Sequence, residues 1–340
     1  GVKTWSVTSI IWGPSPPSDG CGNWGKNLVR NFHHLGALST VCDNDQKRLD
    51  FVAREFRGVK TTSDYDSVLR DPEVSAIVIA TPSDTHFNLA RQALLAGKHV
   101  YVEKPLARDV KHAEELDALA TERNLVLMVG HLLLYHPAVN CLKDLIASGE
   151  LGDLLFVRSD RMNFNMSRRD WSVLWDLAPH DISMMSYLLD CSSPEVSRVG
   201  GWDTLGDGLV DVAYLDLSFP TGAGDRIIPG QVRNSWIDPQ KVVRLTVNGT
   251  KKTAVLNDTQ QEDKLALHSQ TPEGRMVVEY PYYPDAEPLH LECEHFLQCI
   301  LRGERPRTDA NNAYTVVRVL SDVEKRLSGR PGRKAPVSSR

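Results

Sequence analysis

Residues 20–25 read GCGNWG, which fits the pattern GxGxxG, and they open a stretch with helical periodicity, NWGKNLVRNFHH. Backbone amides at the start of a helix can point at a pyrophosphate, and glycine lets the backbone approach it closely. A single match of this kind is weak evidence, but its position at a helix start predicts a dinucleotide site. The residues expected to bind the cofactor here are Gly20, Gly22, Asn23, Trp24 and Gly25.

An acidic residue, Asp43, stands eighteen positions beyond Gly25, at the end of the second apolar run, LSTVCD. A carboxylate at this place can accept hydrogen bonds from the hydroxyls of the adenosine ribose, and it would repel a 2′-phosphate. The spacing therefore favours NAD over NADP as the cofactor. The alternative interpretation is that Asp43 is only a turn residue in the sequence DND.

The segment PSPPSD, residues 14–19, separates the first apolar run from Gly20. Three prolines in so short a segment cannot continue a central strand. Either the first strand ends early and a longer loop leads to the glycines, or the segment displaces part of that strand. We still expect the cofactor to bind.

Short β-branched runs alternate with helical patterns up to residue 130, which indicates an α/β Rossmann domain with a doubly wound parallel sheet. Strands are predicted at 7–12, 38–42, 76–80, 99–102 and 126–129. Helices are predicted between them at 23–34, 46–56, 65–70, 88–96 and 110–123.

The pattern changes beyond residue 130. Helices are predicted at 137–148, 179–189, 289–301 and 310–328, with strands at 154–159, 210–219, 242–247 and 276–280 in a region rich in β-structure. Alternating apolar and polar residues predict a large, mostly antiparallel, open-faced sheet. We therefore expect a Rossmann domain at 1–130, an α+β domain for substrate binding and oligomerisation at 131–328, and a flexible tail at 329–340.

Length and composition limit the classes of function. A chain of 340 residues exceeds what one hydrophobic core usually organises, so two domains are expected. The formal net charge of −5 and the lack of a long basic run argue against a nucleic-acid partner. No stretch resembles a membrane span or a signal peptide, so we expect a cytoplasmic protein. The six cysteines lack CxxC spacing and are expected to be free thiols, with a metal site at Cys293, His295 and Cys299 as a weak alternative.

Polar motifs follow the third and fourth predicted strands, at the sheet edge where open α/β folds bind ligands. The third run ends in ATPSDTH, so Thr81 and Pro82 are expected beside the nicotinamide ribose, with His86 either there or on the surface at a helix start. The fourth run ends in VEKP, which places Glu103 and Lys104 at the end of a buried strand. Charges at such a position are costly unless they have a partner or a task, so we expect both to contact the cofactor.

The motifs GxGxxG, ATPxxxH and EKP precede an acid and a histidine four residues apart, in the sequence Asp176-Leu-Ala-Pro-His180. In this order they resemble the glucose-fructose oxidoreductase/inositol dehydrogenase/MocA-like family. The resemblance extends over nearly the whole chain, since that family also has an open-sheet substrate domain after a dinucleotide domain. It implies that Lys104 lies beside the nicotinamide and the substrate hydroxyl, and that the peptide bond before Pro105 is cis.

These residues suggest how an alcohol would be oxidised. A secondary alcohol loses its hydroxyl proton as hydride leaves the same carbon, which requires a base within hydrogen-bond reach. We expect His180 to take this proton, Lys104 to hold the oxygen and Asp176 to orient the pair; the nearest alternative makes Lys104 the base. Pro179 suits the first turn of a helix, so we expect His180 near a positive helix end that keeps the imidazole neutral. In a purely structural reading, Asp176 caps the helix and His180 packs.

The sequences HLLLYHPAV (131–139), RMNFN (161–165) and LWDLAPHDIS (174–183) look most like the family branch of UDP-N-acetylglucosamine 3-dehydrogenases. The resemblance implies oxidation at C3 of a UDP-linked N-acetylhexosamine to a keto sugar. Arginines could bind the diphosphate through charge-assisted hydrogen bonds, and aromatic rings could stack on the sugar or uracil. Packing or a solvated loop is the alternative for each of these side chains. Besides Lys104 and His180, the expected substrate-binding residues are Tyr135, His136, Arg161, Arg168 and Trp175.

Two other functions stay open at this stage. A free polyol such as an inositol, or an aldose, could replace the nucleotide sugar at the same site. Alternatively, the chain could be a catalytically inert protein that senses NAD or binds a partner, although Lys104, Asp176 and His180 argue against this because a sensor needs no acid–base set. An open sheet commonly buries its uncovered face against another subunit, so we expect a homodimer or homotetramer.

Overall fold

The computed structural model describes residues 8–12, 22–164, 172–222 and 226–328. These residues form two compact units. The first takes in the described residues of Gly1–Tyr135 together with Ala286–Val317, and the second takes in those of His136–Asp285 and Arg318–Arg340. The boundary therefore falls within the last helix, α9 (Ala310–Ser328).

Residues 286–317 depart from the predicted domain organisation, which placed them in the second domain. They include helix α8 (Pro288–Arg302), which packs against helix α1 (Gly22–His34) of the first unit. Just before α8, Glu287 accepts hydrogen bonds from Arg30 at 2.5 Å and Asn31 at 3.1 Å, both on α1. A segment that returns to an earlier unit leaves no local pattern, because its partners are distant in sequence.

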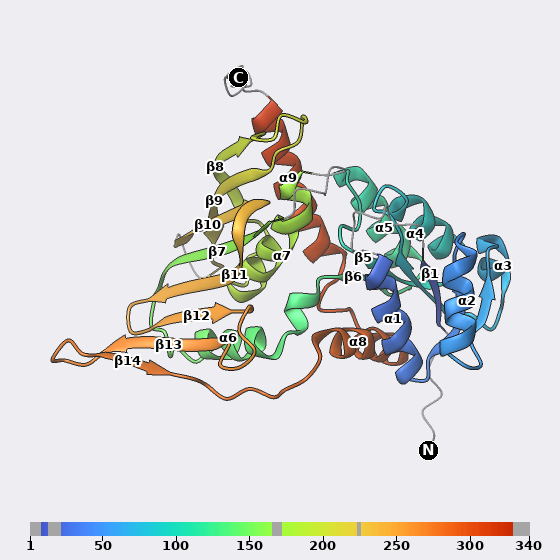
Figure 1. Ribbon diagram of the computed structural model, residues 1–340, viewed down its shortest axis with the longest axis horizontal. Coiled ribbons are helices and arrows are strands. Elements are labelled where there is room, and N and C mark those ends of the chain that lie inside the picture. The colour runs from blue at the N-terminus through green and yellow to red at the C-terminus, as the bar shows by residue number, and fades with distance from the viewer. Residues whose placement is uncertain (1–7, 13–21, 165–171, 223–225, 329–340) are drawn as a thin grey trace. The chain divides into compact units, whose positions relative to one another are not determined.

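The first unit contains a six-stranded sheet with the order β3-β2-β1-β4-β5-β6, and every neighbouring pair is parallel. The predicted Rossmann-type sheet is therefore confirmed. Its strands are β1 (Thr8–Trp12), β2 (Leu38–Cys42), β3 (Lys60–Thr62), β4 (Ala76–Ala80), β5 (His99–Glu103) and β6 (Leu127–Gly130). Its other helices are α2 (Gln46–Glu55), α3 (Tyr65–Arg70), α4 (His86–Leu95), α5 (Val110–Glu122) and the 3₁₀ helix η1 (Leu132–Tyr135), as Figure 1 shows.

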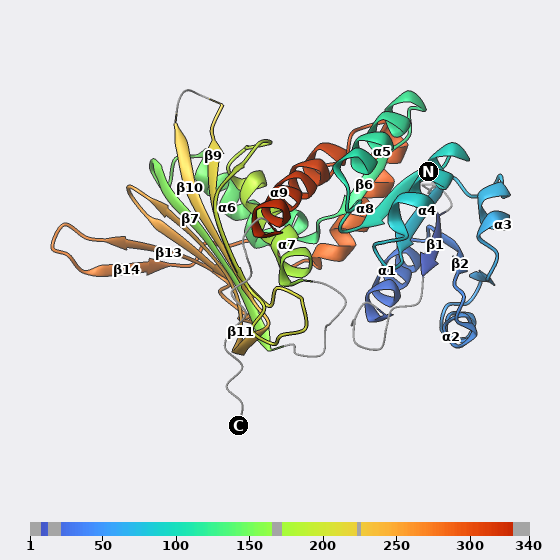
Figure 2. The ribbon, with the colours of Figure 1, turned by 90° about the horizontal axis from the view of Figure 1, so that it is seen from above.

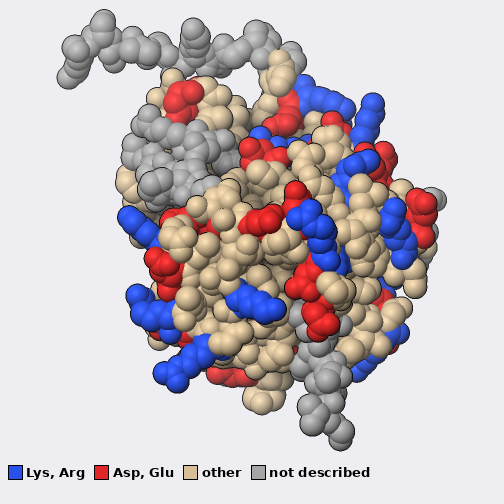
Figure 3. All heavy atoms as spheres, turned by 90° about the vertical axis from the view of Figure 1, so that its right-hand side faces the viewer, with Lys and Arg blue, Asp and Glu red and all other residues tan. Residues whose placement is uncertain are grey.

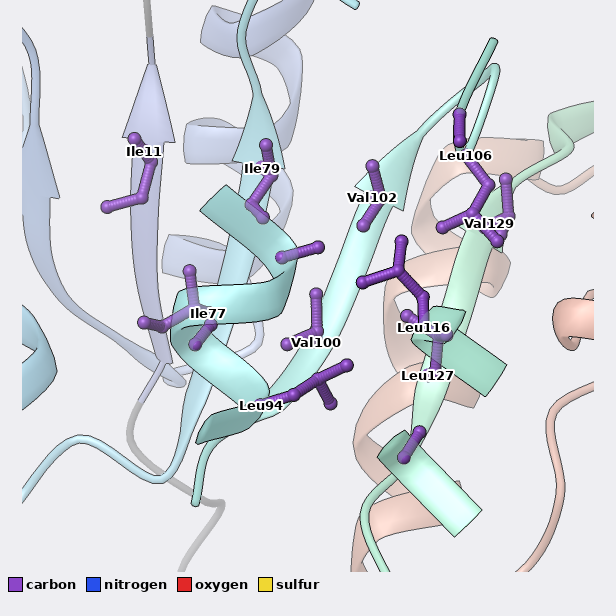
Figure 4. Packing of buried hydrophobic residues seen from close by; sticks show 14 of the residues in the cluster. Ile11, Ile77, Ile79, Leu94, Val100, Val102, Leu106, Leu116, Leu127 and Val129 are labelled. Atoms are coloured by element: carbon purple, nitrogen blue, oxygen red, sulfur yellow. The ribbon is translucent and has the colours of Figure 1, made fainter. Parts of the chain in front are cut away.

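The core of this unit forms because the central strands are covered on both faces. All five residues of β4, AIVIA, are buried, as expected for a strand inside a parallel sheet. Figure 4 shows Ile11 of β1 beside Ile77 and Ile79 of β4, with Leu94 of α4 packed against Val100 of β5. The edge strand β3 was not predicted, because its three residues, KTT, are mostly exposed and form no apolar run.

The second unit contains an eight-stranded sheet with the order β14-β13-β12-β11-β7-β10-β9-β8. Among the described strands of this sheet only β7 and β10 pair in parallel, so the predicted, mostly antiparallel sheet is confirmed. Helices α6 (Pro137–Ala147) and α7 (Val173–Leu188) lie on one face, and the described residues place no helix on the other (Figure 2). The strands are β7 (Leu154–Phe164), β8 (Glu195–Trp202), β9 (Val212–Pro220), β10 (Ile227–Ser235), β11 (Ile237–Gly249), β12 (Thr253–Asn257), β13 (Leu265–Gln270) and β14 (Met276–Glu279).

Helix α7 corrects one prediction. It begins at Val173, with Ser172 at the N-cap, whereas the sequence analysis began it at Pro179, which in fact lies inside the helix. An interior proline removes one backbone hydrogen bond. The side chains of Leu174 and Trp175 are buried, and this packing offsets the cost of the lost bond.

The charged side chains on the face shown in Figure 3 are of both signs. No helix among the described residues is both long and apolar enough to cross a membrane. On the face that Figure 3 presents, Lys and Arg side chains are interspersed with Asp and Glu. This mixture is typical of an ordinary protein surface and gives no footprint for a polyanion on that face.

Candidate active site

The carboxyl ends of the parallel strands share one edge of the first sheet. Asp43 follows β2, Thr81 follows β4 and Lys104 follows β5. Helix α1 begins at Gly22, after β1, and has no acidic residue in its first turn. Because β1 lies between β2 and β4, this edge contains the switch point at which such sheets bind dinucleotides. Gly20 and residues 14–19 lie outside the described residues.

Asp43 is buried, with 2% of its surface exposed. Its Oδ1 accepts a hydrogen bond from the Asp45 amide at 2.8 Å, and its Oδ2 pairs with Nη1 of Arg48 at 3.2 Å. Burial raises the pKa of Asp43, while the Asp45 amide and Arg48 act in the opposite direction. The carboxylate therefore orders its own turn, and its place after β2 is the one expected for a ribose ligand.

His86 lies inside the first unit, so the alternative of a surface histidine is wrong. The side chain is 1% exposed. Its Nε2 lies 2.8 Å from the Thr81 carbonyl oxygen and its Nδ1 lies 2.8 Å from the Pro105 carbonyl oxygen. Burial lowers the pKa of His86, and the two carbonyls oppose this. The ring thus ties the turn after β4 to the turn after β5.

The EKP turn follows β5. The Lys104–Pro105 peptide bond is cis, which confirms what the family resemblance implied. Glu103 accepts a hydrogen bond from Nε1 of Trp24 at 2.6 Å, so the start of α1 is fastened to the end of β5. Burial raises the pKa of Glu103, while Trp24 and Lys104 lower it. Trp24 and Glu103, both expected to contact the cofactor, therefore bond to each other.

Asp176 and His180 lie on one face of α7. Every other side chain of this helix except Tyr187 is buried, whereas these two are partly exposed. A separation of four residues places them one turn apart on the same face. The pair is therefore presented as an acid and an imidazole side by side on an otherwise buried helix.

The helix-end argument for His180 is wrong, because α7 starts at Val173 and His180 lies two turns inside it. The helix dipole acts mainly within the first turn. It is Asp176 that occupies the first turn, where a negative charge is favoured. Asp176 is not the cap either, since the N-cap is Ser172.

The residue after His180, Asp181, was not predicted as a site residue. It is fully buried and accepts hydrogen bonds from Ser159 at 2.8 Å, Arg161 at 3.0 Å and Asn234 at 2.9 Å. These donors lie on β7 and β10, so the network fixes α7 on the sheet next to His180. The Nε of Arg161, which was expected to meet a diphosphate, is thereby engaged with Asp181. Arg168 lies outside the described residues.

Three aromatic candidates have neighbours that account for them as structural residues. Tyr135 is buried, and its hydroxyl lies 3.3 Å from Oγ1 of Thr308. His136 caps α6 by accepting a hydrogen bond from the Ala138 amide at 3.1 Å. Trp175 is 5% exposed and donates to Glu324 at 2.5 Å. These contacts agree with the packing alternative for each side chain, and contact with a sugar stays a prediction.

His131 and Glu292 are two further buried polar residues that were not predicted. His131 follows β6, is 1% exposed, and its ring nitrogens have no hydrogen-bond partner among the described residues. Burial, together with the charge of Lys104, lowers the pKa of His131 to about 3. A neutral imidazole beside Lys104 can therefore bind a ligand. Glu292 is fully buried on α8.

The suggested metal group does not assemble in the described residues. No set of three His, Cys, Asp or Glu side chains among them is arranged to hold a metal ion. Cys299 and His295 are neighbours, with Sγ and Nε2 3.4 Å apart, but Nε2 accepts a hydrogen bond from the Arg307 amide at 3.1 Å. The described cysteines are free thiols.

Known proteins are similar to this chain in sequence. A UDP-N-acetylglucosamine 3-dehydrogenase of Acidithiobacillus ferrooxidans is 31% identical over 204 residues, which are 56% of this chain and 63% of the relative. The match thus spans less than two thirds of that relative's length. A scyllo-inositol 2-dehydrogenase (NAD(+)) of Bacillus subtilis is 26% identical over 295 residues, 83% of each chain.

The fold has solved counterparts. The structure of the UDP-N-acetylglucosamine 3-dehydrogenase from Acidithiobacillus ferrooxidans superposes with a TM-score of 0.79 over 93% of this chain and 95% of the other, at 24% identity. The profile of the oxidoreductase family with an NAD-binding Rossmann fold matches residues 20–131, and that of the Gfo/Idh/MocA C-terminal domain matches residues 139–255. These two stretches take in more than half of the chain, which therefore belongs to the Gfo/Idh/MocA family of oxidoreductases.

Proposed function

We propose that this oxidoreductase converts a secondary hydroxyl of a sugar to a ketone, at C3 of a UDP-linked N-acetylhexosamine. The observation that carries the proposal is the placement of Asp176 and His180, which are partly exposed and one turn apart on a helix that is otherwise almost wholly buried. The pair places an acid and an imidazole next to each other where a ligand can contact both. An alcohol oxidation needs such a pair, because the hydroxyl proton must be removed as the C–H bond breaks.

The residues of the first unit fit NAD. Helix α1 starts at Gly22 without an acidic residue in its first turn, which leaves its amides available to a pyrophosphate. Asp43 stands at the end of β2, where a carboxylate favours free ribose hydroxyls over a 2′-phosphate. The buried imidazole of His131 has no partner among the described residues and can bind a ligand beside Lys104. NAD, when bound, accepts the hydride.

Each polar residue has one task in the proposed reaction. His180 takes the hydroxyl proton of the substrate, and Asp176 orients its ring from the preceding turn. Lys104 donates a hydrogen bond to the substrate oxygen and stabilises the negative charge that develops there. With the roles exchanged, Lys104 would take the proton and His180 would hold the oxygen.

The substrate class rests on the relatives. The UDP-N-acetylglucosamine 3-dehydrogenase is the more similar of the two relatives in its aligned part, which supports a nucleotide sugar. The inositol dehydrogenase aligns over more of the chain, 83% against 56%, and this favours a free polyol as the second candidate. In the first case Arg161 and Arg168 are proposed to meet the diphosphate.

A screen for NADH formation tests both candidates. The purified protein is incubated with NAD and either UDP-N-acetylglucosamine, myo-inositol, scyllo-inositol or a simple aldose, and NADH is followed by its absorbance. We expect NADH with the nucleotide sugar, together with a 3-keto product. NADH with a polyol alone would establish the second candidate. Tight binding of NAD without NADH from any substrate would overturn the proposal and favour a protein that senses the cofactor.

A further inference from the structure

Two carboxyl groups interact inside the first unit, and one of them immediately precedes Lys104. Glu103 ends β5, and Glu292 belongs to α8. Glu292 is fully buried, and the groups that act on it include no positive charge. An ionised carboxylate in such a place would be uncompensated, which is costly. Neither the cofactor nor the proposed chemistry uses Glu292.

The hydroxyl of Tyr101 interacts with both acids. It donates a hydrogen bond to Oε1 of Glu103 at 3.2 Å. The hydroxyl also interacts electrostatically with Glu292, whose two carboxyl oxygens have no hydrogen-bond partner among the described residues. A hydroxyl that has donated its hydrogen to one carboxylate can still accept a hydrogen bond. Tyr101 can therefore accept a hydrogen bond from a protonated carboxyl group.

The surrounding structure holds Tyr101 in this place. Its ring packs edge-on against Phe32 of α1 and Phe296 of α8, with centroids 6.5 Å and 5.8 Å away. Gly130, the β6 partner of Glu103, leaves the space that the two polar groups occupy. A Cβ on Gly130 would lie 2.7 Å from the Tyr101 oxygen and 2.8 Å from Oε2 of Glu103.

The charges around the pair favour one proton. Burial raises the pKa of Glu292 well above its usual value and the charge of Glu103 raises it further, while the Tyr101 hydroxyl acts in the opposite direction. Around Glu103 itself, Trp24 donates from α1, Tyr101 donates from β5, and Lys104 supplies the positive charge. Two other titratable groups interact with Glu292, and neither supplies a compensating charge: burial, together with the charge of Glu292, raises the pKa of both the Cys293 thiol and the Tyr135 hydroxyl.

We propose that Glu292 is a positioning residue for the EKP turn. It keeps one proton, donates it in a hydrogen bond to Tyr101, and Tyr101 in turn donates to Glu103, so that a single negative charge lies beside Lys104. In the series Glu292–Tyr101–Glu103 each acceptor then has one donor. Oε1 of Glu103 also accepts a hydrogen bond from Nε1 of Trp24. The expected effect of Glu292 on turnover rests on the proposed function, because it acts through Lys104. The proton held on Glu292 does not depend on that function.

Infrared spectroscopy of the full chain tests the stored proton without any substrate. Wild type at neutral pH is expected to show the carbonyl stretch of one protonated carboxylic acid, and this band should disappear as the pH rises. Glu292→Gln, which copies the shape of the neutral acid, should lack the band. Glu294→Gln is the matched control, because Glu294 is on the same helix but partly exposed, and it should keep the band. Tyr101→Phe should shift the band, since the acid loses its acceptor.

A second measurement tests the positioning role. The pH profile of kcat/KM should show an ionisation on its alkaline side in wild type and Glu294→Gln, and this step should be missing in Glu292→Gln. Absence of the band in wild type, or its persistence in Glu292→Gln, would overturn the proposal. The band with identical pH profiles in all three proteins would overturn the positioning role. If wild type shows the band but turns over none of the substrates, the result counts against the proposed function and not against the proton on Glu292.

Discussion

Lys104 and His180 offer the most direct test at the scale of single residues. Lys104→Ala removes the donor to the substrate oxygen, and His180→Asn removes the base but keeps a polar side chain. General acid–base catalysis typically contributes about 10²–10⁴-fold, so kcat should fall by that order in each variant. Steady-state kinetics with the substrate from the screen measures the loss, and NAD titration should show unchanged affinity for His180→Asn.

The control for these variants is Lys111→Ala, which removes an exposed lysine from α5 in the same unit. Its kcat should equal that of wild type. Turnover that survives both Lys104→Ala and His180→Asn would rule out the proposed mechanism. If only Lys104→Ala flattens the pH profile, Lys104 rather than His180 is the base.

The sequence predicted those site residues whose signal is local. Asp43 after β2 and the Asp176/His180 pair are candidates from short motifs, and the cis bond of the EKP turn is what the family resemblance implied. Asp181 was not predicted, because its hydrogen-bond partners, Arg161 among them, lie on strands distant in sequence. Glu292 left a weaker signal: an acid three residues after Leu289 and four before Phe296, on the apolar face of a helix.

At the scale of elements, the sequence predicted the buried strands more accurately than the start of helix α7. The runs at 38–42 and 76–80 coincide with β2 and β4, because buried parallel strands are continuous apolar runs. The start of α7 was misplaced by six residues, since proline is common at a first turn and its presence inside a helix depends on tertiary packing. Packing of this kind cannot be read from local preference alone.

The attachment of α7 to its sheet predicts a large loss of stability for Asp181→Asn. The substitution leaves the charge of Arg161 without its buried partner and turns one acceptor into a donor. Breaking a buried ion pair typically costs about 3–5 kcal/mol, so unfolding by urea should show a loss of about 3 kcal/mol. Asp190→Asn is the control: this carboxylate pairs with Lys143 but is 85% exposed, and its loss should cost at most about 1 kcal/mol. Equal losses in the two variants would contradict a structural role for the network.

At the scale of the whole molecule, the chain returns to its first unit after completing most of the second. Residues 286–317 bring α8 back onto α1, and with it Glu292 to Tyr101 and Glu103. Local periodicity predicted the helix but not its unit, because contacts across such sequence distances leave no periodic signature. The buried acid pair therefore exists only through this long-range return.

Two buried groups, His131 and Glu292, make the free energy of unfolding depend on pH in opposite directions. His131 has its pKa lowered from 6.5 to about 3, so the unfolded chain binds more protons there and stability rises with pH up to about 6.5. Glu292 has its pKa raised well above 4.5, so the folded chain binds more protons. Its contribution is complete below about pH 4.5 and is lost as the pH rises through the folded pKa.

Comparison of wild type with Glu292→Gln isolates the second limb, because His131 and the other titrating groups are common to both proteins. Gln cannot ionise, so its contribution stays constant while that of Glu292 falls with pH. The free energy of unfolding of wild type should therefore fall relative to the variant as the pH rises above about 4.5, by at most about 1.4 kcal/mol per pH unit. Urea unfolding across this range measures the difference, and Glu294→Gln should run parallel to wild type. If Glu292→Gln also ran parallel, Glu292 would be ionised in the folded protein, and a charge of that kind at a fully buried position would require a cation that the described neighbours do not provide.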